Sequence, residues 1–429
     1  MRFITVATDG YEAAANALRR TSLHDSPEME AVVRGIIADV RNRGDEALLE
    51  LSRRFDSPDV SSVETEAAAW KDAEAKTPGN LQRAIRAAYD RIVSFHEKQR
   101  KTSWTDVQPG RVTGQIVRPL ERVGIYVPGG TAIYPSSVLM TAGPARAAGV
   151  EEIVLCTPAQ RDGRPAPSVL FAASVAGIER VFCVGGAQAV AAMAYGTETV
   201  PRVDKVVGPG NSYVNIAKRL LWGVVDIDML AGPSEVCVVA DETANPVFAA
   251  LDLLTQAEHD VECAAYLITC DAELARRVVV EIDRQLATQS RAGVLREALE
   301  RNGAIIVTES VEQACELANV CAPEHLALMV RDPFASLGRI KNAGAVLLGD
   351  YTPQTLGDYA AGPSHTLPTS GTARFASPLH VDTFLKKSSF IYYDREALNE
   401  SAEILTTLAR AEGFMAHADA VDARTGWSG

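Results

Sequence analysis

Histidine is scarce in this chain of 429 residues, and most of its histidines lie late in the sequence. Five of the seven follow residue 258, in segments rich in glycine, proline and acidic residues. Imidazole is the side chain whose ordinary pKa lies closest to neutrality, so these segments are the first place to look for proton transfer or metal binding. The full set is His24, His96, His259, His325, His365, His380 and His417.

The segment LDLLTQAEHD (251–260) closes a predicted helix. Gln256 and His259 stand three positions apart, so an amide oxygen and an imidazole nitrogen project from one helical face and can reach one cation. Glu258 and Asp260 point elsewhere and are candidates for supporting such ligands. Glutamine is a rare metal ligand, so a capped helix end at the surface is the competing interpretation.

The segment APEHL (322–326) precedes an apolar strand. Pro323 fixes its own φ and favours an extended conformation for Ala322. Glu324 and His325 are therefore predicted on a stiff loop where the chain enters a sheet. A carboxyl group beside an imidazole suits proton abstraction and activation of water, because their surroundings can tune two different acidities. The alternative is a surface loop with two ordinary polar groups.

A glycine- and proline-rich stretch runs from Gly357 past Pro378. Loops longer than about 12–15 residues are usually functional or disordered, and the apolar and aromatic residues here favour function. Asp358 is a candidate metal ligand, and His365 is a candidate contact for a substrate carboxylate or hydroxyl. Glu412 and His417 follow a predicted helix near the C-terminus. Spacing alone does not select His417, because a single histidine in a tail is usually solvated.

Three glycine-containing turns are candidates for cofactor binding, although the chain has no G-x-G-x-x-G motif. Each follows a predicted strand and precedes a predicted helix. Backbone amides at such helix starts attract anions, and ligands collect at the carboxyl ends of parallel strands. A nucleotide is favoured, but the turns alone do not distinguish NAD from a sugar phosphate. The turns are Val127–Gly130, Val184–Gln188 and Val207–Asn211.

From about Arg122 onward, short apolar runs alternate with helical patterns. This alternation predicts an α/β fold with parallel strands covered on both faces. Two units are expected, near 126–233 and 234–379. Helices predicted from Ser26, Asp45 and Asn80 are expected to complete the second unit. The last fifty residues predict a strand at 389–393, a helix at 396–412 and a tail.

The bulk composition excludes several classes of protein. The formal net charge is −13, which disfavours nucleic-acid binding because that needs a basic face. Seven cysteines without a Cys-x-x-Cys pair favour buried, reduced thiols over disulfides or a cysteine zinc site. No signal peptide and no run of about 18 apolar residues is found, so no membrane span is expected and the cytoplasm is the default location.

Taken together, these segments resemble the histidinol dehydrogenase family over nearly the whole chain. The resemblance implies an intertwined homodimer with two incomplete Rossmann-like domains. It divides the chain into a small N-terminal segment (1–23), a first large domain (24–125 with 234–379), an NAD-binding domain (126–233) and a tail domain (380–429). The specific motifs are RVGIYVPGG (122–130), YPSSVLM (134–140), VGGAQAVAA (184–192), VDKVVGPGN (203–211), IDMLAGPSEV (227–236), TQAEHD (255–260), APEHL (322–326), GDYAAGPSHTLPT (357–369) and EGFMAH (412–417).

The resemblance also implies one Zn²⁺ per subunit, with a histidine lent by the partner subunit's tail. The implied zinc ligands are Gln256, His259, Asp358 and His417. The implied substrate contacts are Ser234, Gln256, His259, Glu324, His325, Asp358, His365, Glu412 and His417. The implied NAD contacts are Tyr126, Gln188 and Asn211.

The implied reaction oxidises L-histidinol through L-histidinaldehyde to L-histidine with two NAD, the last step of histidine biosynthesis. His325 accepts the hydroxyl proton while hydride goes to NAD, and Glu324 activates the water that adds to the aldehyde. NAD supplies the redox chemistry, and the protein supplies orientation and proton handling.

Three positions differ from the expected family pattern. Ser364 replaces a commoner asparagine, His380 a usual serine, and Thr255 a frequent alanine. The first two are candidates for reshaping the substrate pocket. A family relative that oxidises another hydroxylated substrate, such as a sulfopropanediol, therefore stays open as an alternative. A non-catalytic zinc- or nucleotide-binding protein is disfavoured, because Glu324 and His325 are both present.

Overall fold

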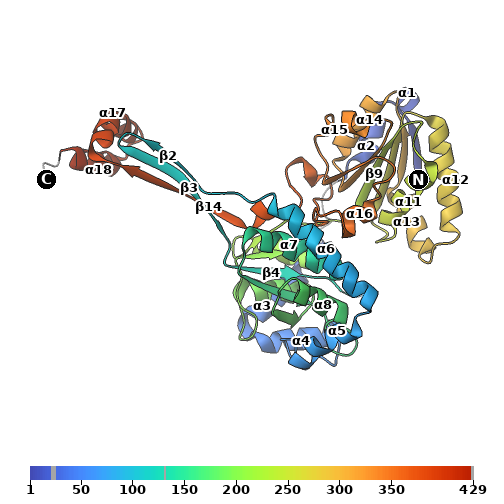
Figure 1. The fold of residues 1–429 in the computed structure, drawn as a ribbon, viewed down its shortest axis with the longest axis horizontal. Helices are drawn as coiled ribbons and strands as arrows, with labels where there is room; N and C mark the ends of the chain where they lie inside the picture. The colour runs from blue at the N-terminus through green and yellow to red at the C-terminus, as the bar shows by residue number, and fades with distance from the viewer. Residues whose placement is uncertain (21–25, 130–131, 427–429) are drawn as a thin grey trace. The chain divides into compact units, whose positions relative to one another are not determined.

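The structure is a computed structural model that describes residues 1–20, 26–129 and 132–426. The chain forms two compact units. The larger unit contains Met1–Gln99 and Leu120–Phe384, and the smaller contains Arg100–Pro119 and Leu385–Gly429. The larger unit carries two parallel sheets with helices on both faces of each (Figure 1). The predicted α/β class is confirmed.

One sheet of the larger unit has five parallel strands in the order β6-β5-β4-β7-β8. Its strands are β4 (Arg122–Tyr126), β5 (Glu152–Thr157), β6 (Arg180–Cys183), β7 (Lys205–Val207) and β8 (Asp226–Ile227). Helices α7 (Pro135–Ala148), α8 (Pro167–Val175), α9 (Gly186–Tyr195) and α10 (Ser212–Leu221) connect them. The strand order reverses between β4 and β7, where Val123 is in register with Lys205. We call this sheet the glycine-turn sheet, because all three glycine turns leave its strands.

The other sheet has six parallel strands in the order β1-β11-β10-β9-β12-β13. From β11 to β13 this repeats the strand order of the glycine-turn sheet. The strands are β1 (Arg2–Thr5), β9 (Glu235–Ala240), β10 (Ala264–Thr269), β11 (Ala304–Val307), β12 (His325–Met329) and β13 (Ala345–Leu348). The helices are α1 (Val6–Asp9), α2 (Tyr11–Leu18), α11 (Pro246–Ala257), α12 (Ala272–Leu286), α13 (Ala292–Asn302), α14 (Val311–Cys321), α15 (Pro333–Leu337) and α16 (Gln354–Tyr359). We call it the histidine sheet, because His325 begins β12.

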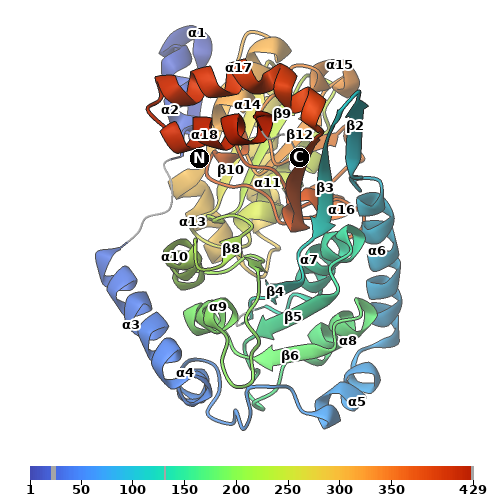
Figure 2. The same cartoon turned by 90° about the vertical axis from the view of Figure 1, so that its left-hand side faces the viewer.

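Four early helices pack on the glycine-turn sheet, as Figure 2 shows. Helices α3 and α4 share a core with α9 and α10, while α5 and α6 share one with α7 and α8. The expectation that these helices complete the unit of residues 234–379 is therefore wrong. An apolar stripe predicts which face of a helix is buried, but both sheets offer a matching apolar face. The helices are α3 (Pro27–Arg43), α4 (Asp45–Phe55), α5 (Ala67–Lys76) and α6 (Gly79–Glu97).

The expected domain boundaries change accordingly. Residues 1–18 are not a separate segment, because β1 pairs with β11 at the edge of the histidine sheet. The expected boundary after residue 125 falls inside β4. The boundary between residues 23 and 24 lies outside the described residues. The predicted start of α3 is confirmed, since the Ser26 hydroxyl accepts a hydrogen bond from the Met29 N–H at 3.3 Å.

The smaller unit is an antiparallel three-stranded sheet followed by two helices that pack on each other. Its strands are β2 (Trp104–Gln108), β3 (Arg111–Pro119) and β14 (Leu385–Tyr393), and its helices are α17 (Arg395–Ala411) and α18 (Met415–Thr425). The predicted strand at 389–393 and helix at 396–412 are confirmed. Strands β2 and β3 and helix α18 were not predicted. No helix in the described part of the chain combines the length and apolar composition that crossing a bilayer requires.

Candidate functional site

Glu324 lies in the short connection between helix α14 and strand β12, and His325 is the first residue of β12. Ala322 ends the helix in a left-handed conformation (φ 49°, ψ 57°), so the expectation of an extended residue before Pro323 is wrong. The left-handed residue reverses the chain, and its N–H still donates to the Ala318 carbonyl at 2.9 Å. Glu324 and His325 are only 7% and 4% exposed, which rules out the surface-loop interpretation.

Glu324 and His325 form a buried acid–base pair. Glu324 Oε1 lies 3.7 Å from His325 Nε2, and Glu324 Oε2 accepts a hydrogen bond from the Glu235 N–H at 2.9 Å. The Ser234 side chain is near enough to Glu324 to lower the pKa of its carboxyl group slightly. Burial raises the pKa of Glu324 well above its usual range and lowers the pKa of His325 to about 3. His325 is therefore a neutral imidazole, the form that can accept a proton.

Asp358 approaches this pair from the short helix α16. Its Oδ1 lies 3.9 Å from His325 Nε2, and its Oδ2 accepts from Gln354 Nε2 at 3.3 Å. Burial raises the pKa of Asp358 to about 6. The sequence predicts a long glycine- and proline-rich loop at Asp358, whereas the structure places it in a helix, where the four-residue spacing lets Gln354 reach it.

His365 is held in a defined tautomer beside Asp358. Its Nδ1 lies 2.9 Å from the Asp358 carbonyl oxygen, and a carbonyl can only accept, so Nδ1 carries the proton. Nε2 is then an acceptor, 3.4 Å from the Ser137 hydroxyl. Burial lowers the pKa of His365 to about 4. His365 thus presents a neutral acceptor nitrogen.

Gln256 and His259 lie at the end of helix α11. Gln256 is buried, and its Oε1 has no hydrogen-bond partner among the described residues. His259 follows the helix and keeps solvent exposure, yet it is close enough to His325 and His365 to lower the pKa of both. A buried amide oxygen without a partner is costly unless something occupies it, and a cation would.

The described residues contain no group of three or more His, Cys, Asp and Glu side chains spaced to hold a metal ion. The predicted zinc ligands include only two such residues in the larger unit, His259 and Asp358, together with the amide of Gln256. The fourth predicted ligand, His417, lies in helix α18 of the smaller unit, where it is exposed and its ring centroid is 5.2 Å from that of Phe414. Glu412 is exposed in the same unit. The roles of His417 and Glu412 stay predictions.

Tyr126, Gln188 and Asn211 lie at the carboxyl ends of strands in the glycine-turn sheet. Tyr126 ends β4, and its hydroxyl oxygen accepts from the Gly186 N–H at 3.1 Å. Gln188 is buried, and its Nε2 has no partner among the described residues. Asn211 is exposed and caps α10 by accepting from the Val214 N–H at 3.1 Å. Gly130 of the first turn lies outside the described residues.

The acid–base pair and the glycine turns lie at opposite ends of the strands in their respective sheets. Ser234 and Glu324 precede β9 and β12, so the acid–base pair lies at the amino ends of strands in the histidine sheet. The glycine turns lie at carboxyl ends, the usual place for ligands in parallel sheets. Sequence analysis did not select Glu235, Gln354 or Ser137. Each forms a hydrogen bond with a predicted site residue, but the sequence around each of them looks like that of an ordinary polar position.

Within the described part of the chain, neither Ser364 nor His380 forms a hydrogen bond with Glu324 or His325. The Ser364 hydroxyl donates to the Met140 carbonyl at 2.9 Å, which ties the loop to α7. His380 Nδ1 lies 2.7 Å from the Pro378 carbonyl. Their predicted effect on the substrate pocket therefore gains no support from these contacts.

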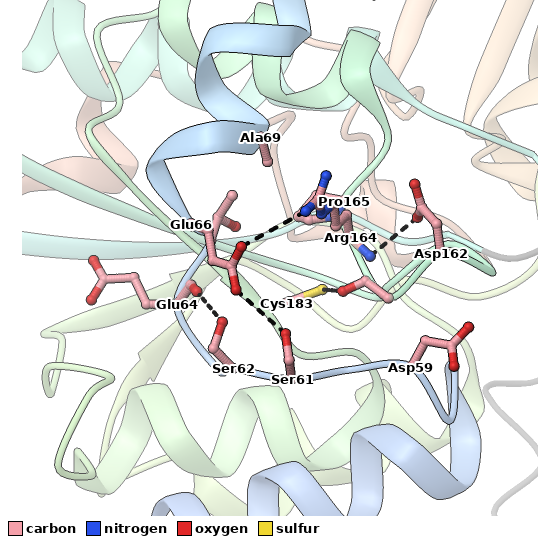
Figure 3. A pocket seen from close by; sticks show the side chains of 12 residues that line it. Asp59, Ser61, Ser62, Glu64, Glu66, Ala69, Asp162, Arg164, Pro165 and Cys183 are labelled. Atoms are coloured by element: carbon pink, nitrogen blue, oxygen red, sulfur yellow. Dashed lines mark hydrogen bonds and ion pairs between the residues drawn. The ribbon is translucent and has the colours of Figure 1, made fainter.

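A cavity of about 190 Å³ lies beside Cys183, apart from all the predicted site residues (Figure 3). Two of its charged groups, Glu66 and Arg164, lie 3.8 Å apart, and the Arg164 backbone N–H donates to the Asp162 carboxylate at 3.2 Å. The Cys183 thiol donates to the Gly163 carbonyl at 3.6 Å, and burial raises the pKa of Cys183 to about 12. This thiol is not a nucleophile at neutral pH.

Two parallel sheets with one repeated strand order, glycine turns on one and a buried acid–base pair on the other, define a doubly wound α/β fold with a candidate catalytic site. A family model described as histidinol dehydrogenase matches residues 19–425. The chain belongs to the histidinol dehydrogenase family.

Individual relatives agree with this assignment. The histidinol dehydrogenase of Geobacter sulfurreducens is 50% identical over 99% of this chain and 100% of its own length. That of Bacillus thuringiensis subsp. konkukian is 50% identical over 92% of each chain. The crystal structure of histidinol dehydrogenase from Elizabethkingia anophelis superposes with a TM-score of 0.93 at 35% identity, covering 99% of this chain and 98% of the other. The predicted family resemblance is confirmed.

Proposed function

We propose that this protein oxidises L-histidinol through L-histidinaldehyde to L-histidine, using two NAD, as the last step of histidine biosynthesis. Membership of the histidinol dehydrogenase family supports the substrate and the pathway. The observation that carries the chemistry is the group formed by the buried Glu324 and His325 with the half-buried Asp358 and His365, in which two neutral imidazoles and two carboxyl groups meet.

The metal site in this proposal is formed by Gln256, His259 and Asp358 with the partner subunit's His417. The unpartnered Gln256 Oε1 supports it, and imidazole with oxygen ligands suits a divalent ion such as Zn²⁺. When bound, the ion acts as a Lewis acid that positions the substrate, and NAD accepts the hydride. Gln354 and His365 orient Asp358 through its Oδ2 and its carbonyl oxygen, which leaves Oδ1 facing His325.

Each proton step falls to one member of the acid–base pair. Neutral His325 accepts the proton of the substrate hydroxyl in the first oxidation. Glu324 accepts a proton from the water that adds to the aldehyde, and His325, once it has released the first proton to solvent, accepts the proton released in the second oxidation. A carboxyl group whose pKa burial raises suits a base that works near neutral pH.

The substrate contacts in this proposal include both members of the acid–base pair. Those in the larger unit are Ser234, Gln256, His259, Glu324, His325, Asp358 and His365. Glu412 and His417 belong to the smaller unit and would come from the partner subunit. The NAD contacts are Tyr126, Gln188 and Asn211. Gln188 supports this assignment, because its buried Nε2 offers a free donor.

A homodimer with shared active sites is part of the proposal. The smaller unit exposes large apolar side chains on its strands and both its helices, including Ile391 (75% exposed), Ile404, Leu408, Phe414 and Met415. So many exposed apolar side chains on one small unit are typical of an interaction surface. In the proposed dimer this unit contacts a second copy of the chain and lends its His417 to the site of that copy.

The test is a spectrophotometric assay of NADH formation with L-histidinol and, separately, with sulfopropanediol. We expect two NADH for each L-histidinol and none from the sulfonate. No NADH from L-histidinol, with turnover of the sulfonate, would reject the proposed substrate and favour the alternative.

A subunit-mixing experiment tests the shared site. His417→Asn and His325→Ala proteins are each expected to be inactive. After unfolding and refolding together, about a quarter of the wild-type rate should return, because half of the dimers are mixed and each mixed dimer has one complete site. No recovery, with mixed dimers verified by differential tagging, would reject the contribution of the partner's tail.

A further inference from the structure

The start of helix α9 is occupied by side chains of the protein itself. The Gly185 N–H donates to Asp56 Oδ2 at 3.1 Å, and the Gly186 N–H donates to the Tyr126 hydroxyl oxygen at 3.1 Å. Amides at a helix start have no partner within the helix and attract phosphates. At this turn a carboxylate of the chain takes the place that a nucleotide phosphate would take.

Asp56 reaches this place from the end of helix α4 and lies directly over the turn. A Cβ atom added to Gly185 would lie 2.8 Å from Asp56 Oδ1, closer than real contacts allow. Glycine at position 185 therefore leaves room for the carboxylate. The same absence of a side chain is what lets phosphates approach the backbone in nucleotide-binding turns.

The charge of Asp56 is not compensated. None of the described cations forms an ion pair with it, and burial raises its pKa from 3.8 to about 6, opposed only by the Gly185 amide. The third glycine turn provides the contrast. There the Gly208 N–H donates to Asp228 Oδ2 at 2.7 Å, but Asp228 also pairs with the buried Lys218. The Asp228 turn is balanced in charge, whereas the Asp56 turn is negative.

A second observation indicates that a ligand binds at this turn. Gln188 lies in the first turn of α9 and is 1% exposed, yet its Nε2 has no acceptor among the described residues. The side chain folds back over Gly186, where an added Cβ would lie 3.3 Å from Nε2. A buried amide donor without an acceptor is costly, so an acceptor from a ligand would satisfy it.

We propose that the Asp56 carboxylate weakens NAD binding by occupying the phosphate position at the start of α9. This inference rests on the proposed use of NAD. A bound dinucleotide either displaces Asp56 from the Gly185 amide or lies beside it, and in both cases its phosphates meet an uncompensated negative charge. Asp56 is thus a determinant of cofactor affinity and takes no part in the proton steps.

The test is Asp56→Asn, which keeps an oxygen acceptor for the Gly185 N–H and removes the charge. We expect the Kd for NAD, measured by calorimetry without substrate, to fall at least about fivefold, because unit charges a few ångströms apart interact by this order even in bulk water and more strongly in a partly solvated site. The KM for NAD should fall in parallel while kcat stays unchanged. A purely structural cap would give equal or weaker binding.

Asp59→Asn is the matched control, since Asp59 is exposed three residues further along the same connection and lies beside the cavity of Figure 3. It should leave the Kd for NAD at the wild-type value. Equal Kd values for wild-type, Asp56→Asn and Asp59→Asn proteins would overturn the inference while leaving the proposed function intact. Wild-type protein that binds no NAD at all would refute both. Should Asp56→Asn fail to fold, Asp56→Ser, with the same expected tightening, decides the question.

Discussion

Replacing Glu324 by glutamine isolates the proposed water-activating step. Glutamine is nearly isosteric, so its amide oxygen can keep the 2.9 Å hydrogen bond from the Glu235 N–H. Its nitrogen then takes the place of Oε1, which lies 3.7 Å from His325 Nε2. The variant therefore keeps the packing of the pair and loses only the group that accepts a proton from water.

The expected loss follows from the value of general-base catalysis. Removing a positioned base typically costs about 100- to 10,000-fold, so oxidation of L-histidinaldehyde should slow by that factor. Oxidation of L-histidinol to the aldehyde depends on His325 and should proceed near the wild-type rate. Metal content should also stay at the wild-type level, because Glu324 is not among the proposed ligands.

Single-turnover NADH formation, started once from L-histidinol and once from L-histidinaldehyde, separates the two steps. Glu312→Gln is a matched control, because Glu312 is exposed at the start of α14, the helix that leads to Glu324. The control should leave both steps unchanged. Equal aldehyde oxidation by wild-type and Glu324→Gln proteins would refute the role assigned to Glu324.

Three further perturbations test the site, the core and the glycine turn. His417→Asn should lower the zinc content of the purified dimer, and metal analysis that finds full occupancy would remove His417 from the ligands. Ile92→Ala should lower the free energy of unfolding in urea by about 2–5 kcal/mol, because the fully buried Ile92 fills the space against Gly143 and leaves a cavity when truncated; a change near zero would contradict this packing. Burial raises the pKa of Asp56 from 3.8 to about 6. Between these two pH values the folded chain holds a proton on Asp56 that the unfolded chain has released. The free energy of unfolding therefore falls as the pH rises through this range. Asp56→Asn should therefore be more stable than wild type by about 3 kcal/mol at about pH 8, with the gap closing toward about pH 4, and a gap independent of pH would refute the assignment.

The alternating strands and helices could be read from the sequence because buried parallel strands are short, continuous apolar runs. The runs at 153–156 and 236–240 lie within β5 and β9. Strand β2 of the smaller unit lacked this signal. All five residues of β2 are exposed in the single chain, so no apolar alternation marks them. The sequence also did not show which sheet the early helices cover, because an apolar stripe on a helix does not identify the sheet that it packs against.

The candidate site was only partly visible in the sequence. The pairing of Glu324 with His325 followed from adjacency and from the strand that begins there. The approach of Asp358 to His325 could not be derived, since it depends on the parallel pairing of β12 with β13 and on the chain returning through α16. The left-handed conformation of Ala322 was not predicted either. The sharp turn from α14 into β12 overrides the usual preference for an extended residue before proline.

The pairing of β1 with β11 has a practical consequence. The family match begins at residue 19, yet Arg2–Thr5 hydrogen-bond along the whole of β11, and Leu18 packs in the same core as Leu317. A protein trimmed to the limits of the match would leave a bare backbone edge and an uncovered apolar helix, the two features that promote association between misfolded chains. Expression of this enzyme should therefore retain its first eighteen residues, and any fusion tag there needs a spacer so that the edge strand can still pair.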